Sequence, residues 1–164
     1  MRETASVAVS RGEGECMRVY LGSDHAGFEL KQQVHALLAD AGYEVIDVGP
    51  ETGDPHDYPD MAALVADGVA GGEARFGVLV CGTGLGMAIA ANKIRGVRAV
   101  QVSDPEMARM SRLHNDANVV TLPGRHIGIE QAQEILDVFL STEFEGGRHQ
   151  RRVDKISALE ERDR

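Results

Sequence analysis

Three short polar segments of the chain combine residue types that can move protons. Residues 23–25 (Ser-Asp-His) follow an apolar run, residues 81–86 (CGTGLG) follow another, and residues 114–116 (His-Asn-Asp) follow a helical segment. Carboxylates, thiols and imidazoles are the side chains that serve as general acids, bases and nucleophiles. If the fold brings these segments together, they indicate a catalytic site for a small polar substrate.

The glycine-rich segment at residues 81–86 has three interpretations. Glycines between a strand and a helix let backbone N–H groups approach an anion, and the helix N-terminus adds positive potential. The letters GTGLG also loosely resemble a dinucleotide-binding fingerprint, but the third glycine is misplaced and the segment follows the third predicted strand. The third interpretation is a tight turn that needs glycine only for its backbone.

Cys81 opens this segment and is a candidate base or nucleophile. A helix N-terminus stabilises a nearby thiolate, which is the reactive form of cysteine. The alternative is a buried structural cysteine that closes an apolar strand. Thr83 could donate a hydrogen bond to a developing oxyanion, or it could cap the helix. A Cys-His-Asp set for acyl transfer stays open, although no nucleophile-elbow motif is present.

His25 and His114 are the candidate general acids among six histidines, since we expect both on loops at the ends of strands. The others are expected to lie mostly on the surface: His35, His56, His126 and His149. No pair of His or Cys residues has zinc-ligand spacing, so the sequence predicts no metal site.

The charge balance argues against generic nucleic-acid or membrane-surface binding, because 17 basic and 26 acidic residues give a net charge of −9. Four basic residues nevertheless cluster near the end, and they fit either a solvated helix or a pocket for a small anion: Arg148, Arg151, Arg152 and Lys155.

No apolar run approaches the ~20 residues of a membrane span. The first residues have no signal-peptide pattern and there are only two cysteines, which favours the cytoplasm.

Apolar runs alternate with helical periodicity along the chain. We predict strands at 18–22, 43–48, 76–80, 97–102 and 118–122, and helices at 25–41, from Pro59, at 87–93, 105–113, 129–141 and 148–161. Gly42 fits a left-handed residue after the first helix, and Asp104 or Ser103 fits an N-cap. The pattern predicts an α/β fold, a Rossmann-like three-layer sandwich with a five-stranded parallel sheet. Ligands of such sheets lie beyond the carboxyl ends of the strands.

Residues 1–17 have no periodicity, so we expect a disordered N-terminal tail, with Met17 a candidate natural start. Residues 18–164 are expected to form a single domain with a C-terminal helix.

Five motifs, GSDHAGFELK, DYP, CGTGLGMAIAANK, RLHNDANVV and GGRHQRRV, occur in an order and spacing that resembles the type B ribose-5-phosphate isomerases. This sugar-phosphate isomerase family also contains the galactose-6-phosphate isomerase subunits, and the resemblance covers about residues 18–160. It implies a Rossmann-like homodimer or tetramer whose sites are shared between subunits. It also implies an aldose–ketose isomerase of the pentose phosphate pathway that works through a cis-enediolate with neither metal nor organic cofactor.

The resemblance assigns roles to thirteen residues. Cys81 matches the base that removes the C2 proton, and residues 85–87 (Leu-Gly-Met) contain no glutamate that could replace it. Asp24 and His114 match groups that open the furanose ring. The loop that holds the enediolate oxygen is matched by Gly82, Thr83, Gly84 and Gly86.

The remaining matches concern binding of the substrate. Asn115 matches a contact to sugar oxygens, and the phosphate end is matched by His25, Arg148 and Arg152. Tyr58 and Arg125 match positions near the site. The residues expected to reach in from a partner subunit are His114, Asn115 and Arg125. Two alternatives stay open. The first is isomerisation of another sugar, namely allose 6-phosphate, galactose 6-phosphate, a four-carbon sugar phosphate or an unphosphorylated aldose, with the loop at 50–58 setting pocket length. The second is a non-catalytic phosphosugar-binding module.

Overall fold

The computed structural model describes residues 16–162 of the chain and contains five strands and six helices in that range. The strands are β1 Arg18–Ser23, β2 Glu44–Asp47, β3 Phe76–Cys81, β4 Ala99–Gln101 and β5 Val119–Pro123. The helices are α1 Phe28–Asp40, α2 Tyr58–Ala70, α3 Leu85–Ala91, α4 Pro105–Asn115, α5 Ile129–Ser141 and α6 Arg148–Leu159.

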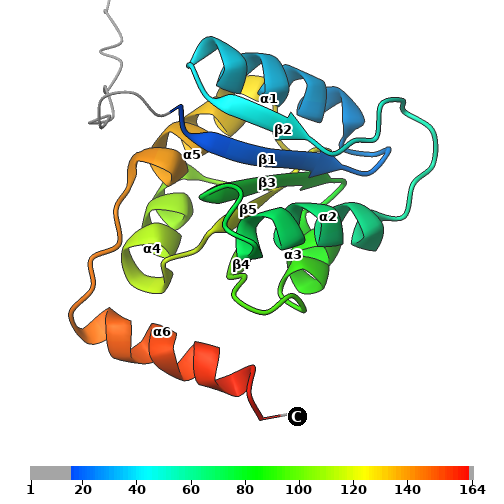
Figure 1. Cartoon of the computed structure of the whole chain (residues 1–164). Helices are drawn as coiled ribbons and strands as arrows, with labels where there is room; N and C mark the ends of the chain where they lie inside the picture. The colour runs from blue at the N-terminus through cyan, green and yellow to red at the C-terminus, as the bar shows by residue number, and fades with distance from the viewer. Residues whose placement is uncertain (1–15, 163–164) are drawn as a thin grey trace, which may run out of the picture.

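The strands form one parallel sheet in the order β2-β1-β3-β5-β4 (Figure 1). Helices α1, α4 and α5 pack on one face through one apolar cluster, and α2 and α3 pack on the other face through a second cluster. This arrangement confirms the predicted α/β fold, a Rossmann-like three-layer sandwich. Because helices cover both faces, the central strands are buried throughout and are apolar rather than alternating.

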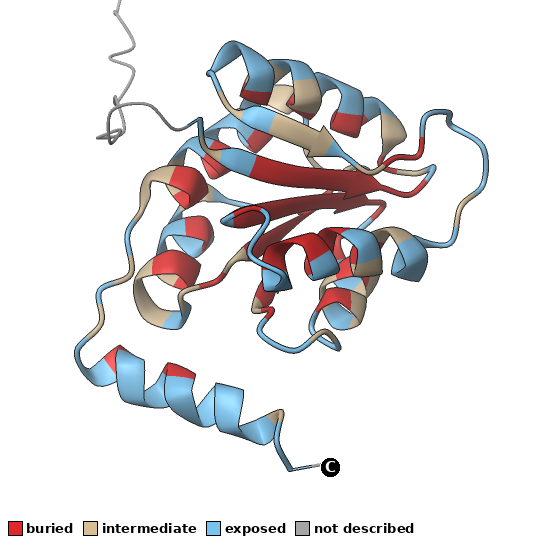
Figure 2. Cartoon of the chain, in the orientation of Figure 1, coloured by how far each residue is buried: buried red, intermediate tan, exposed pale blue. Residues whose placement is uncertain are grey.

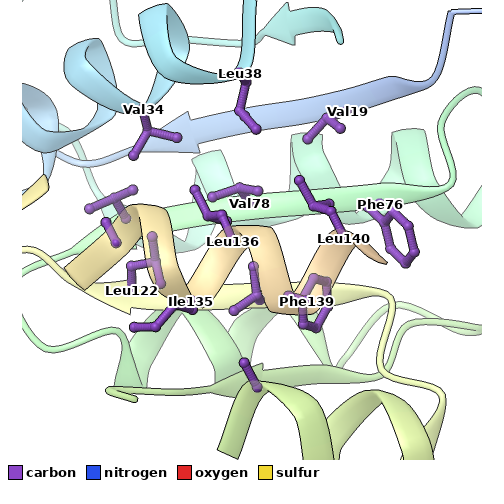
Figure 3. Packing of buried hydrophobic residues seen from close by; sticks show 14 of the residues in the cluster. Val19, Val34, Leu38, Phe76, Val78, Leu122, Ile135, Leu136, Phe139 and Leu140 are labelled. Carbon is purple, nitrogen blue, oxygen red and sulfur yellow. The ribbon is translucent and has the colours of Figure 1, made fainter. Parts of the chain in front are cut away.

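Side chains of successive strand residues enter the two cores in turn. Val19 and Leu21 of β1 belong to the cluster under α1 and α5, whereas Tyr20 between them belongs to the cluster under α2. Figure 3 shows the first cluster, in which α5 lies over β3. There Phe76 and Phe139 meet edge to face with ring centroids 5.5 Å apart.

Local signals in the sequence predicted several element boundaries. Helix α5 has the predicted bounds, the Asp104 carboxylate caps α4 by accepting from the Met107 N–H at 2.9 Å, and Gly42 is left-handed with a φ of 86°. Helix α1 begins three residues later than predicted, because the Asp24 carboxylate accepts from the Gly27 N–H at 3.0 Å and forms a turn first. Strand β4 is shorter than predicted and α4 extends to Asn115.

The two ends of the chain differ in how they meet the sheet. Residues 1–15 of the predicted tail lie outside the described residues, but Met17 is part of the sheet region because its carbonyl accepts from the Glu44 N–H at 3.0 Å. Helix α6 lies apart from the other layers, and its buried residues are His149 and Val153 (Figure 2). No helix within residues 16–162 is long and apolar enough to cross a membrane.

We predict that Leu136→Ala, at a side chain with no solvent exposure, lowers the free energy of unfolding by about 2–5 kcal/mol, because it leaves a cavity between α5 and the sheet. Urea unfolding followed by circular dichroism measures this. Gln33→Ala on the exposed side of α1 is the control and is expected to stay within about 0.5 kcal/mol of the parent. Equal losses in both variants would contradict the core assignment.

Candidate active site

The carboxyl ends of β1, β3 and β5 meet at one edge of the sheet and bring two of the polar segments together. Ser23 pairs with Val80, and Cys81 pairs with Pro123. Backbone hydrogen bonds continue past the strand ends. The Asp24 N–H donates to the Val80 carbonyl at 3.2 Å, and the Gly124 N–H donates to the Cys81 carbonyl at 2.7 Å. Asp24 and Cys81 are therefore neighbours across adjacent strands, as the parallel fold predicts.

Cys81 lies at the base of this edge with 5% of its surface exposed. Its Sγ accepts a hydrogen bond from the Gly84 N–H at 3.1 Å, which holds the thiol against the loop at residues 82–86. Thr83 is exposed, and its Oγ1 accepts from the Leu85 N–H at 3.3 Å. The Thr121 hydroxyl donates to the Gly84 carbonyl at 2.7 Å and so ties the loop to β5.

Close contacts explain why the loop at residues 82–86 needs glycine. Gly84 has a φ of 76°, and a Cβ there would lie 3.0 Å from Gln101 Cγ and 3.1 Å from Thr121 Oγ1. A Cβ at Gly86 would lie 2.7 Å from the Tyr58 ring. The loop is thus pressed between β5 and the first residue of α2, which places Tyr58 at the site.

Arg125 is also placed at this loop, by its own chain. A Cβ at Gly82 would lie 3.2 Å from Arg125 Nη1, and the Arg125 N–H donates to the Gly82 carbonyl at 3.1 Å. The expectation that Arg125 reaches the site from a partner is therefore corrected: Arg125 follows β5, whose carboxyl end lies beside that of β3, so the chain's own sheet brings it there.

Asp24 and His25 extend the edge toward β2. Asp24 is 7% exposed and held by its hydrogen bond to Gly27, whereas His25 is exposed. The segment after β2 is anchored beside them. The buried Lys31 ammonium donates to the Asp47 carboxylate at 2.7 Å and to the Pro50 carbonyl at 3.0 Å, which fixes where the loop toward Tyr58 begins.

His114 and Asn115 do not lie at this edge, which corrects the prediction that they sit on loops at the strand ends. Both belong to the last turn of α4, and Arg98, just before β4, donates from Nε to the Asn115 carbonyl at 3.1 Å. A helix that connects two parallel strands runs antiparallel to them, so its last turn returns to the amino ends. Applied to the sequence, this rule would have placed His114 and Asn115 near the amino ends of the strands. Asp116, with a φ of 46°, ends the helix there.

His114 belongs instead to a cluster with Glu145 and His149. The rings of His114 and His149 stack with centroids 4.2 Å apart and planes at 13°. Glu145 Oε2 lies 3.9 Å from His114 Nε2 and 3.5 Å from His149 Nε2.

The prediction that His149 lies on the surface is wrong. Only 4% of it is exposed, because the first turn of α6 presses this ring against α4, whereas His126 is exposed as expected. Burial lowers the pKa of His149 from its usual value, and His114, Arg148 and Arg152 lower it further. No local signal in the sequence indicates this burial, because it depends on contact between α6 and the last turn of α4.

Arg148 and Arg152 are exposed, four residues apart on α6, beside this cluster. The expectation that they share one phosphate with His25 is not met within a single chain, because His25 lies at the carboxyl edge of the sheet and α6 follows α4 at the other edge. A hollow of about 680 Å³ lies between α6 and β4, with Arg98, Asn115, Ile156 and Leu159 among its lining residues.

His114, Glu145 and His149 are a group within residues 16–162 whose ligand atoms lie within 4.8 Å of one another, as a metal would require. Their geometry does not suit one. Nearly parallel stacked rings direct their nitrogen lone pairs side by side, whereas a metal needs lone pairs that converge. The absence of a metal site stays a prediction.

The fold and the two groups of polar residues define a class: an α/β protein of Rossmann-like topology with proton-transfer groups at the carboxyl edge of a parallel sheet. Comparison with known proteins specifies the class further. The family model described as Ribose/Galactose Isomerase matches residues 19–156. Ribose-5-phosphate isomerase B of Escherichia coli (strain K12) is 49% identical over 145 residues, which are 88% of this chain and 97% of that protein.

Two solved structures show the same similarity. The chain resembles a ribose 5-phosphate isomerase from Thermotoga maritima with 51% identity, a TM-score of 0.85, and coverage of 87% of this chain and 98% of that one. It resembles ribose-5-phosphate isomerase B from Mycoplasma genitalium, solved with bound ribulose 5-phosphate, with 42% identity, a TM-score of 0.86, and coverage of 89% and 97%. The chain therefore belongs to the ribose/galactose isomerase family.

We predict that Gly84→Ala destabilises the chain more than Gly72→Ala. Both glycines have a φ of 76°, which costs an alanine about 1–2 kcal/mol, but only Gly84 has atoms where the new methyl group would lie. Gly72 has nothing within 4 Å, so it isolates the backbone cost. Urea unfolding of both variants measures the difference, and equal midpoints would show that the loop at residues 82–86 is not tightly packed.

Proposed function

We propose that this chain interconverts ribose 5-phosphate and ribulose 5-phosphate as a metal-independent isomerase. Membership of the family and the printed names of its relatives support the substrate. The observation that carries the proposal is the pairing that places the Asp24 carboxylate and the Cys81 thiol on neighbouring strand ends beside the loop at residues 82–86. A carboxylate, a thiol and a hydroxyl gathered at one edge of the sheet suit proton transfer next to a carbonyl.

The first step is opening of the furanose ring. The anomeric hydroxyl gives up its proton as the bond between C1 and the ring oxygen breaks, and the ring oxygen takes up a proton. Asp24 and His114 are the groups for these two transfers, since one is an acceptor when ionised and the other can donate when protonated. The product is the open-chain aldose, with no net change in protons.

The second step moves a proton between C2 and C1. The Cys81 thiolate removes the C2 proton, and the electrons of that bond form the enediolate. The proton then returns from Cys81 to C1 while the O2 hydroxyl proton passes to O1, which gives the ketose. A proton next to a carbonyl is weakly acidic, so the developing oxyanion also needs donors in fixed positions. Thr83 and the backbone of Gly82, Gly84 and Gly86 are assigned this role. The short tie from Thr121 to Gly84 keeps the loop in place during the reaction.

Arg148 and Arg152 are assigned to the phosphate, together with His25, and Asn115 to sugar oxygens. Guanidinium groups one helical turn apart can bind one phosphate through charge-assisted hydrogen bonds. Tyr58 and Arg125 flank the loop and enclose the reacting carbons. Because the phosphate is remote from C1 and C2, its binding energy positions the sugar.

The separation of the two groups supports a homodimer or tetramer with shared sites. Asp24, Cys81 and Thr83 lie at the carboxyl edge, and His114, with the arginines of α6, lies beyond the amino edge. One site needs both groups, so a second copy of the chain must supply the one that its partner lacks. Exposed apolar side chains on α3 and α6 suit such an interface: Leu85, Ile89, Ile156 and Leu159.

A thiol that acts as a base must stay reduced, which supports placement in a reducing compartment such as the cytoplasm. Six-carbon and four-carbon sugar phosphates are the alternative substrates, and the family description supports galactose derivatives. We assign the length of the pocket to the loop between Pro50 and Tyr58, whose start is anchored by the hydrogen bond from Lys31 to the Pro50 carbonyl.

We predict that Cys81→Ala lowers kcat for ribose 5-phosphate by about 100-fold or more, because the alanine cannot take the C2 proton, while the Kd for ribulose 5-phosphate changes little. Ketose formation and uptake of solvent deuterium at the reacting carbon measure the step, and calorimetry measures binding. Cys16→Ser, at an exposed cysteine, is the matched control and is expected to keep full turnover.

Three results would contradict parts of this proposal. No turnover by the parent protein would remove ribose 5-phosphate as the substrate, and the same assay would pass to other sugar phosphates. Binding without turnover of any of them would indicate a phosphosugar-binding module. Full turnover by Cys81→Ala would keep the isomerase but remove Cys81 as its base.

We predict that mixing Cys81→Ala and His114→Ala subunits restores about a quarter of the parent activity, because half of the dimers are mixed and each mixed dimer has one intact shared site. The two variants are mixed after mild dissociation and assayed together. Two Cys81→Ala preparations with different tags, mixed in the same way, are the control. Failure to recover activity, with mixed dimers demonstrated by mass, would mean that each chain builds its own site.

A further inference from the structure

His149 is a buried polar residue that the mechanism does not use. Its Nε2 atom has no hydrogen-bond partner among the described residues, and 4% of the residue is exposed. Buried polar atoms without a partner are uncommon and call for an explanation. The ring stacks on His114, the residue assigned to ring opening, at a centroid distance of 4.2 Å.

The backbone around His114 and His149 holds the two rings in contact. The Glu145 N–H donates to the Leu113 carbonyl at 3.1 Å, which ties the segment before α6 to the last turn of α4. Gly146 and Gly147 have φ values of 68° and 57°, and these left-handed residues turn the chain so that α6 starts beside His114. The backbone around residues 145–149 thus fixes the position from which the His149 ring contacts His114.

The two rings compete for one carboxylate. Glu145 Oε2 is within 4 Å of Nε2 on both histidines, so a proton on either ring is stabilised by the same charge. The other charged groups facing His149 are Arg148 and Arg152 of α6, and both disfavour a positive charge on it. His114, with 38% of its side chain exposed, is the ring that water and substrate can reach.

We propose that His149 is a positioning residue for His114: its buried ring fixes the plane of the His114 ring by stacking and shares the Glu145 carboxylate with it. This inference rests on the proposed function for the role of His114. It gives a role to a buried histidine whose Nε2 has no hydrogen-bond partner among the described residues and whose ring packs against His114.

The test measures the pKa of His114 by proton NMR of its imidazole Cε1–H in the parent and in two variants. His149→Phe keeps a flat ring but frees Glu145 for His114 alone, so the pKa of His114 is expected to rise by roughly 0.5 unit or more. Glu145→Gln removes the carboxylate, so the pKa of His114 is expected to fall by a similar amount. His35→Phe and Glu130→Gln are the matched controls on other helices and are expected to leave it unchanged.

Kinetics supply the second readout. One limb of the pH profile of kcat/KM reports the protonation of His114. This limb is expected to move to higher pH in His149→Phe and to lower pH in Glu145→Gln. His149→Ala, which removes the ring, is expected to lower kcat about tenfold with little change in KM, because the ring does not touch the substrate. A merely structural histidine would lower the amount of active enzyme and leave both the pH profile and the pKa of His114 in place.

The outcomes separate the inference from the function on which it rests. If the parent protein isomerises no sugar phosphate, the proposed function fails, while the NMR titration still decides whether Glu145 and His149 control the proton on His114. Opposite shifts in the two variants support the inference. A pKa of His114 that is the same in Glu145→Gln as in the parent overturns it, and this exposed substitution does not depend on whether His149→Phe folds.

Discussion

The parallel pairing of β3 with β1 on one side and β5 on the other is the constraint on which the site depends. This pairing sets Val80 opposite Ser23 and Cys81 opposite Pro123, so the segments that leave these three strands start at the same level. Hydrogen bonds from Asp24 to Val80 and from Gly124 to Cys81 then extend the pairing into the loops. A shift of one residue in either register would turn Cys81 toward the opposite core and separate it from Asp24.

The same pairing separates the residues of the proposed site into two groups within one chain. In a parallel sheet every connecting helix returns to the amino ends, so residues at the end of α4 are on the other side of the molecule from residues after β3. Helix α6 then extends the second group away from the body, with only His149 and Val153 buried. Asp24, Cys81 and Thr83 thus lie at one edge of the sheet, and the guanidinium groups of Arg148 and Arg152 lie beyond the other edge.

Local chemistry made much of the fold predictable from the sequence. Apolar runs predicted the strands, and the helical spacing of Ile135, Leu136 and Phe139 predicted α5. Asp104 before Pro105 predicted the start of α4. The motif residues around Cys81 were also found in this way. The strand order, the burial of His149 and the position of Arg125 were not, because each depends on contacts between segments far apart in the chain. His114 was placed at the wrong edge because its neighbours in sequence look like a loop, whereas the direction of α4 decides where it lies.

The division of the polar residues into two separate groups also has a consequence for how such a protein can diverge. Each group is built from different stretches of the chain, residues 24–86 with Arg125 for one, and residues 114–115 with residues 145–152 for the other. In the shared site that we propose, a copy that lost Cys81 after duplication of the gene could still complete its partner's site through His114 and α6, and the reverse would hold for a copy that lost α6. Selection could then tune sugar recognition in one copy and proton transfer in the other, and an obligate pair of unlike subunits would result.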